Sequence, residues 1–123
     1  MKLEAFAATG RPFIDGYGGG GFRVAGVDHA GAVLLLPDGV RPWDVATAAE
    51  ITLDSLAPVA EQGAIEVLLI GCGVRGSLLP RSLREALRAR GIVADAMDTG
   101  AACRTFNVLL AENRRVAAAL LPV

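Results

Sequence analysis

The second half of the chain alternates apolar runs of strand length with stretches of helical character, and this alternation constrains the fold more than any other feature. The runs IEVLLI, IVADAM and RVAAALL span residues 65–70, 92–97 and 115–121, and each has the length of a buried strand. Between the first two we predict a helix that begins at Pro80 and ends at Gly91. A second helix is predicted over residues 101–112. Strands separated by single helices indicate an α/β core.

The first half has a different pattern. From Pro12 to Pro37 the runs FRVAGV and AVLLLP, separated by GYGGGG and DHAG, predict antiparallel strands and turns. No Lys-Ser/Thr pair follows Gly18–Gly21, so we interpret these glycines as a hairpin or bulge rather than a phosphate-binding loop. The stretch PDGVRPWD is predicted to be a loop. Thr52 is expected to cap a short helix, LDSLAPVAEQ, which Pro58 must kink or divide. The whole pattern predicts a mixed sheet.

A length of 123 residues predicts one domain, residues 1–123. Apolar residues make up 53% of the chain before its 15 glycines are counted, so some strands should be buried on both faces, or a partner should cover part of the surface.

Location and partner class follow from what the chain lacks. Met1 to Ala8 has neither the apolar core of a secretion signal nor an organelle-targeting pattern, so we expect the sequence to start at the domain. The apolar runs are far shorter than the roughly 18 to 20 residues of a membrane span. We therefore predict no membrane insertion, a cytoplasmic location and reduced thiols. A formal net charge of -1 predicts no nucleic-acid binding.

Charge is nevertheless uneven. Residues 1–63 hold four basic and eight acidic residues, whereas residues 64–123 hold eight basic and five acidic. Arg81, Arg84 and Arg88 are spaced to share one helical face, with Arg75 and Arg90 nearby. This face is either a surface for an anion or an acidic partner, or simply the solvated side of a helix.

Gly71, Gly73 and Gly76 spell G-x-G-x-x-G directly after a predicted strand, which resembles a dinucleotide-binding turn. In that turn the helix begins within the glycine motif, so that the pyrophosphate lies at the helix N-terminus. Pro80 places the helix start too far along the chain. We therefore predict no NAD(P) binding, and interpret Gly71 and Gly73 as a tight turn at the carboxyl end of the strand.

The last helix offers the richest group of candidate residues. Asp98 or Thr99 can cap it, and an apolar stripe should face the core, formed by Ala102, Phe106, Leu109 and Leu110. Cys103 and Asn107 lie one turn apart on an adjacent face, beside Arg104. A thiol near a helix N-terminus and an arginine can be reactive, but a buried, inert Cys103 is the alternative we favour. Arg104 could bind an anion or pair internally with Asp98 or Glu112.

Metal binding is not expected. Cys72 and Cys103 form no CxxC pair, and the chain has only one histidine, His29, so no zinc or iron-sulfur ligand set is present.

The motifs LLIGCG, GIVADAMDT and AACRTFNVLLAENRRVAAALLP, with FIDGYGGGGFRVAG and AVLLLPDGVRPW before them, closely resemble a small family. That family includes mitochondrial respiratory complex I assembly factor three, the adipogenesis-associated protein of animals and uncharacterised prokaryotic proteins. The resemblance implies a single compact three-layer α/β domain with a mixed central sheet and an N-terminal antiparallel hairpin part. For the mitochondrial member it implies a role in assembling complex I, and it implies no catalytic residue that can be carried over.

Two functional hypotheses remain open. The first is a non-catalytic binding or assembly-factor-like module with a protein partner, which includes the option of a homo-oligomer. The second is an enzyme-like domain that binds a small molecule or anion between the Gly71–Gly76 loop and the helix starting near Thr99. For either, we predict no cofactor, no catalytic residue and a pocket bordered by Gly71, Cys72, Gly73, Asp98, Thr99, Cys103, Arg104 and Asn107.

Overall fold

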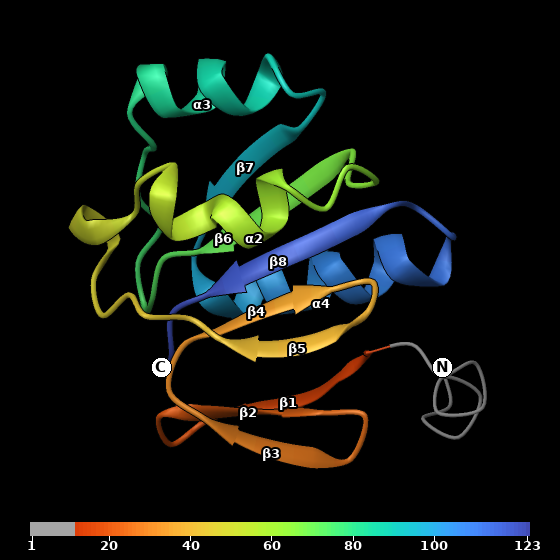
Figure 1. Cartoon of the computed structure of the whole chain (residues 1–123). Helices are drawn as coiled ribbons and strands as arrows, with labels where there is room; N and C mark the ends of the chain where they lie inside the picture. The colour runs from red at the N-terminus through yellow and green to blue at the C-terminus, as the bar shows by residue number, and fades with distance from the viewer. Residues whose placement is uncertain (1–11) are drawn as a thin grey trace.

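The structure is a computed structural model that describes residues 12–123 (Figure 1). Within this part, a central sheet has five strands in the order β5-β4-β8-β6-β7. They are β5 (Gly39–Pro42), β4 (Val33–Leu36), β8 (Val116–Leu120), β6 (Val67–Gly71) and β7 (Val93–Met97). Strand β4 is antiparallel to β5 and β8, whereas β6 is parallel to both β7 and β8. The predicted mixed sheet is confirmed.

A second sheet of three antiparallel strands comes from the N-terminal part of the described chain, in the order β1-β2-β3. Its strands are β1 (Ile14–Gly18), β2 (Gly21–Val24) and β3 (Val27–Ala30). Gly19 and Gly20, with φ of +61° and +83°, form the turn between β1 and β2, which a two-residue hairpin with the twist of the strands requires. The interpretation of this glycine run as a hairpin is confirmed.

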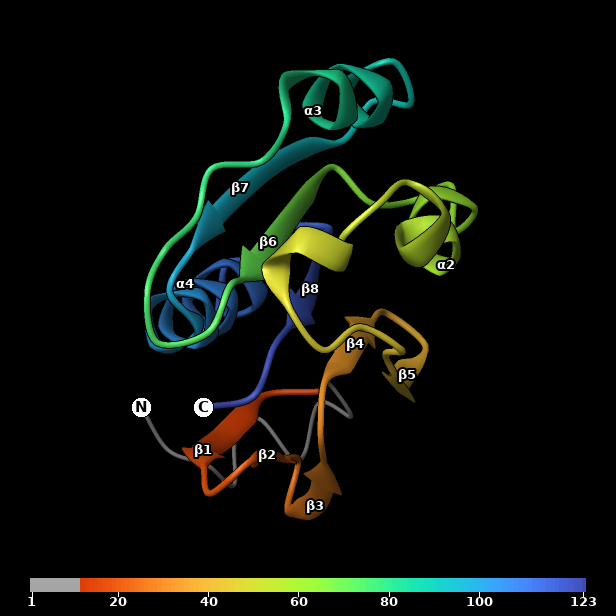
Figure 2. The same cartoon turned by 90° about the vertical axis from the view of Figure 1, so that its left-hand side faces the viewer.

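The helices lie on both faces of the central sheet (Figure 2). On one face are the short α2 (Ala57–Ala60) and α3 (Arg81–Arg88), and on the other are α4 (Thr99–Ala111) and the three-stranded sheet. Two 3-10 turns, η1 (Ala48–Glu50) and η2 (Asp54–Leu56), lie between β5 and α2. The fold therefore has three layers, with the five-stranded sheet in the middle.

Two apolar clusters fill the spaces between these layers. One joins α2 and α3 to the sheet through Leu56, Leu83, Leu87 and their neighbours. The other joins α4 and the three-stranded sheet to the opposite face through Phe22, Phe106, Leu110 and their neighbours. All residues of β4 and β8 are buried. Central strands covered on both faces need apolar residues at every position, which accounts for the high apolar content.

The two helices predicted in the second half are confirmed, with ends that differ by one to three residues: α3 ends at Arg88, three residues before Gly91. Pro80 precedes α3, and Asp98 rather than Thr99 is the N-cap of α4. Pro58 divides the predicted helix of residues 53–62 into η2 and the single turn α2. The Thr52 hydroxyl accepts the N–H of Ser55 at 3.1 Å, and the Ser55 hydroxyl accepts the N–H of Thr52 at 2.9 Å. This reciprocal pair closes the turn before η2, whose N-cap is Leu53 rather than the expected Thr52.

The strand predictions of the first half need three corrections. FRVAGV is not one strand, because Ala25 and Gly26 have φ of +49° and +82° and turn the chain between β2 and β3. The separators GYGGGG and DHAG contribute residues to β1 and β3. PDGVRPWD contains the edge strand β5, which ends at Pro42, a position that a sheet edge tolerates because no ladder hydrogen bond is lost there.

No helix in residues 12–123 is long and apolar enough to cross a membrane. The expectation for Met1 to Ala8 falls outside the described residues.

Candidate functional site

Thr99, which is fully buried, ties the start of α4 to the ends of β6 and β8. Its Oγ1 donates to the carbonyl of Leu121 at 2.7 Å and accepts the N–H of Gly73 at 2.9 Å. Its own N–H donates to the carbonyl of Gly73 at 2.8 Å. A Cβ on Gly71 would lie 3.0 Å from the Thr99 Cα, so only glycine permits this approach without a shift. The Gly71–Gly76 loop and the start of α4 are thus hydrogen-bonded to each other, as a contact that we call the junction.

Asp98 completes the cap of α4. Its Oδ1 accepts the N–H of Ala101 at 2.9 Å, and its carbonyl accepts the N–H of Ala102 at 3.0 Å. The N–H of Thr99 bonds to Gly73, so two N-terminal donors of α4, those of Thr99 and Ala101, have acceptors outside the helical ladder. Free first-turn N–H groups are what make a helix N-terminus an anion site, so part of that capacity is used internally here.

Arg104 lies on the outer side of this junction. Its Nη1 donates to the hydroxyl of Tyr17 in β1 at 3.2 Å, and both side chains are close to Gly100, where a Cβ would lie 2.7 Å from the Tyr17 hydroxyl. No salt bridge in residues 12–123 joins Arg104 to Asp98 or Glu112. The partner of Arg104 is thus a tyrosine from the three-stranded sheet.

Asn107 also connects α4 to β1, through two partly buried hydrogen bonds. Its Oδ1 accepts the N–H of Ile14 and its Nδ2 donates to the carbonyl of Ile14, both at 2.9 Å. The amide group therefore pairs with β1 as a neighbouring strand would. This pairing gives Asn107 a structural role, which its position one turn after Cys103 did not predict.

The two thiols lie on opposite faces of the central sheet. Cys103 is 2% exposed within the cluster under α4, and burial raises the pKa of its thiol to about 12, with Arg104 opposing and Asp98 assisting that shift. Cys72 is half-buried on the face covered by α3. Burial raises its pKa, and a hydrogen bond from the Ser77 backbone opposes the rise. Both cysteines are free, and these pKa directions keep them in the thiol form.

The eight residues predicted to border a pocket therefore separate into groups. Gly71, Gly73, Asp98 and Thr99 form one bonded junction. Arg104 and Asn107 face β1, and the two cysteines occupy different clusters.

The glycine motif does not open a helix. Helix α3 begins at Arg81, after a loop that runs from Cys72 to Pro80. The predicted distance between the glycine turn and the helix is confirmed, and the prediction that the chain does not bind a dinucleotide rests on that geometry.

A groove that sequence reasoning missed runs between α3 and β7. Its volume is about 260 Å³, and it is lined by Arg81, Arg84, Glu85, Arg88, Ile92, Val93 and Ala94. The arginine spacing indicated the helical wall of this groove. The strand wall could not be predicted, because nothing in the sequence of β7 shows that it lies at the edge of the sheet.

A wider hollow of about 430 Å³ lies over the three-stranded sheet, where Gly16 to Phe22 meet Arg23, Asp28, His29 and Ala30. Arg23 and Asp28 are both exposed and 3.8 Å apart, so they neutralise each other. Across residues 12–123, no group of three or more His, Cys, Asp or Glu side chains is arranged to hold a metal ion.

Comparisons with known proteins agree with this architecture. The chain is 43% identical over 111 residues to an uncharacterised protein of Rhodobacter capsulatus, covering 89% of this chain and 84% of that protein. It is 37% identical over 123 residues to NADH dehydrogenase (ubiquinone) 1 alpha subcomplex assembly factor 3 of Danio rerio, covering 99% of this chain and 69% of that protein. A solved structure of an outer membrane protein from Bartonella henselae aligns with a TM-score of 0.86 and 47% identity, covering 92% of this chain and 96% of that one.

The family model described as "Protein of unknown function (DUF498/DUF598)" matches residues 14–121, from the start of β1 to the residue after β8. The family resemblance inferred from motifs along nearly the whole chain is thereby confirmed, and the chain belongs to the DUF498/DUF598 family.

Proposed function

We propose that this chain is a non-catalytic, assembly-factor-like module that binds a protein partner while a larger complex forms. The similarity to the Danio rerio assembly factor supports this proposal, since it extends over 99% of the chain. The chain spans 69% of that protein's length, so the whole assembly factor's role is an expectation for this chain rather than a property carried over.

The observation that carries the proposal is an exposed apolar loop between β6 and α3. Val74 is 82% exposed and Leu78 is 96% exposed. Leu78 lines a small cavity that shares Arg84 and Ala94 with the groove beside β7. Burying one leucine side chain against a partner contributes about 2 kcal/mol. Large apolar side chains that are this exposed near a basic groove are typical of surfaces that another protein covers.

The chemistry of the junction supports binding rather than catalysis. The side chain that could serve as a nucleophile, Cys103, is buried with a raised pKa, and the polar groups around Thr99 bond to one another. A nucleophile needs access and a lowered pKa. The same proposal includes a single domain over residues 1–123. It also includes a cytoplasmic location, which the two free thiols support because thiols stay reduced there.

The proposal is tested by native mass spectrometry of the chain purified at low salt from the organism that encodes it. We expect a defined complex with a different protein, present at a fixed stoichiometry. A monomer, or only copies of this chain, would contradict the proposal. The variant Leu78→Asp should reduce the amount of complex, because it places an unpaired charge where apolar burial is expected. The matched control is Val108→Asp on α4, where Val108 is 54% exposed and distant from the loop in sequence.

A further inference from the structure

Among residues 12–123, no strand pairs with the outer edge of β7, which is the last strand of the five-stranded sheet. In a parallel pair, alternate residues direct both backbone groups to the same neighbour. The N–H of Val93 donates to Glu66, and the carbonyl of Met97 accepts from Cys72, so the odd-numbered residues of β7 bond to β6. Ala94 and Ala96 therefore direct their N–H and carbonyl groups to the outer edge.

The groove described above opens on Ala94. Three arginines of α3 stand over this part of the edge, and among residues 12–123 Arg84 and Arg88 form no salt bridge. Arg81 is 3.5 Å from Glu85, in a pair that is mostly exposed. The groove thus combines a free backbone donor and acceptor with two unpaired guanidinium groups.

The loop Ser77–Leu79 borders the second half of the same edge. A small cavity of about 80 Å³ separates it from Ala94, Asp95 and Ala96. No backbone hydrogen bond in the described chain joins these loop residues to β7. The stretch from Ile92 to Ala94 is therefore the open part of the edge, and Leu78 lies at its far end.

We propose that this groove binds a short, extended, acidic segment of the protein partner, which adds to the outer edge of β7. This inference rests on the proposed function and names the surface and the chemistry of the partner. The backbone of the segment pairs with Ala94, as in other cases of β-strand addition. Its carboxylates pair with Arg84 and Arg88, and its apolar residues cover Leu78.

The positive charge of Arg84 and Arg88 favours an acidic segment over a second copy of this chain as the occupant of the groove. Two copies joined edge to edge at β7 would each bring Arg84 and Arg88 to the same interface, where like charges are unfavourable. An acidic segment neutralises them instead. The two faces of β7 indicate which side chains of the bound segment should lie on each side of the sheet. Ala94 packs with the cluster on the α3 side, so Val93 and Asp95 lie on the opposite face, and both are exposed. In the bound segment, side chains on the α3 side should therefore be acidic, and side chains on the Val93 side should be apolar, so that each contacts a suitable neighbour on β7 or α3.

The test is a titration of the isotope-labelled full chain with a synthetic peptide of alternating valine and glutamate, followed by amide NMR. We expect the Ala94 amide signal to shift and its hydrogen exchange to slow, because the peptide backbone accepts from that N–H. Peptide with lysine in place of glutamate should bind at least tenfold more weakly, since it meets two unpaired guanidinium groups. Equal binding of the two peptides, or a glutamate peptide that leaves Ala94 unchanged, would overturn the inference.

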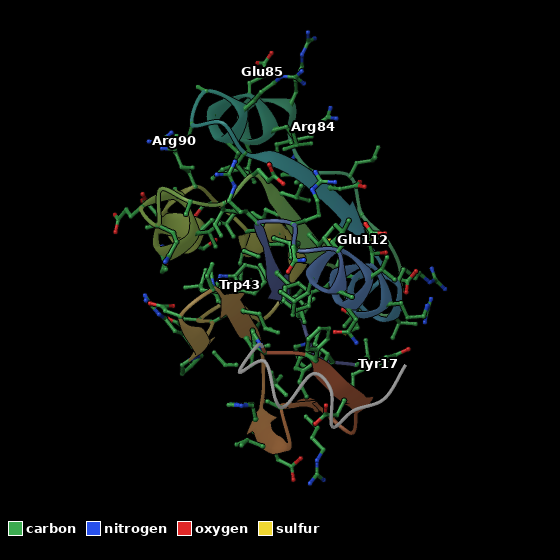
Figure 3. All side chains as sticks on the ribbon, turned by 90° about the vertical axis from the view of Figure 1, so that its right-hand side faces the viewer. Tyr17, Trp43, Arg84, Glu85, Arg90 and Glu112 are labelled. Atoms are coloured by element: carbon green, nitrogen blue, oxygen red, sulfur yellow. The ribbon has the colours of Figure 1, made fainter. Side chains whose placement is uncertain are left out.

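The double variant Arg84→Gln/Arg88→Gln should weaken glutamate-peptide binding about tenfold through loss of two exposed charge-assisted contacts. The control Arg41→Gln/Arg90→Gln removes the same net charge from exposed positions outside the groove. Arg90 lies on the opposite side of α3 from Arg84 (Figure 3). A control that loses as much affinity as the groove variant would show that net charge, not the groove, attracts the peptide.

The inference and the proposed function fail separately. If no protein partner co-purifies with the wild-type chain, the proposed function fails. If a partner co-purifies equally with wild type and with Arg84→Gln/Arg88→Gln, the function stands and the groove is not its site. Loss of the partner from the groove variant alone, together with peptide binding at Ala94, supports both.

Discussion

At the scale of single residues, Thr99 holds the junction together. Among residues 12–123 it is the polar or charged residue that the fold buries completely. Its hydroxyl serves one donor and one acceptor of the backbone, on Gly73 and Leu121. Buried backbone groups that lose a partner retain the full cost of desolvation.

We therefore expect Thr99→Val to lower the free energy of unfolding by about 2 to 3 kcal/mol, because Gly73 and Leu121 each lose a partner while the side-chain volume is kept. Urea denaturation measures this change. Thr99→Ser keeps the hydroxyl and should cost only about 1 kcal/mol for the lost methyl group. Similar stability of Thr99→Val and wild type would mean that the hydroxyl contributes little.

Cys103 gives a prediction that depends on pH. Its pKa in the folded chain is about 12, against an ordinary value of 9.0, because burial penalises the thiolate. The neutral thiol therefore favours the folded state below pH 9.0, and this contribution is lost as the pH rises toward 12. At pH 8 we expect an alkylating reagent to label Cys72 faster than Cys103, and both equally in urea, as read by mass spectrometry. Rapid native labelling of Cys103 that Arg104→Ala abolishes would instead identify an activated thiol.

Arg104 shows where residue-level prediction ends. Sequence neighbours suggested Asp98 or Glu112 as its partner, yet the structure pairs it with Tyr17, 87 positions away. The same holds for Asn107, whose partner Ile14 is 93 positions away. Local spacing limited the cap of α4 to Asp98 or Thr99, because a cap depends on the next three residues, and the structure has it at Asp98. Contacts between distant strands and helices depend on the assembled sheet.

At the scale of elements, Asn107 fastens the three-stranded sheet to α4. Removing its amide group should leave the backbone of Ile14 without these partners. For Asn107→Ala we expect faster hydrogen exchange in β1, β2 and β3, with local opening made easier by about 1 to 2 kcal/mol, while β6 and β8 stay protected. Val108→Ala, an exposed change on the same helix, is the control. Uniformly faster exchange across both sheets would show that the two sheets unfold together.

Element prediction succeeded where the pattern was continuous. The buried strands β6 and β8 and the helices around them were predicted because apolar runs, Pro80 and Gly91 mark their ends. It failed at β1, β3 and β5. These strands contain Gly, Asp or Pro, residues that are depleted in strands, and the turn at Ala25 requires a positive φ that alanine rarely adopts. Edge and hairpin strands depend on pairing more than on composition.

At the scale of the whole molecule, we propose that a protein partner binds at the edge of the central sheet beside α3. Within residues 12–123, the three-layer arrangement covers both faces of the central sheet and leaves the outer edge of β7 without a neighbouring strand. The arginines of α3 and the exposed Leu78 lie beside this edge. Part of the excess of basic residues in the second half of the chain therefore lies on one surface.

Binding at this edge is tested by amide hydrogen exchange. Exchange rates in the complex purified from the encoding organism are compared with those in the free chain. We expect slower exchange at Ala94 and in the loop around Leu78, with exchange in the three-stranded sheet unchanged. Slower exchange confined to the β1–β3 sheet, or no difference at Ala94, would contradict it.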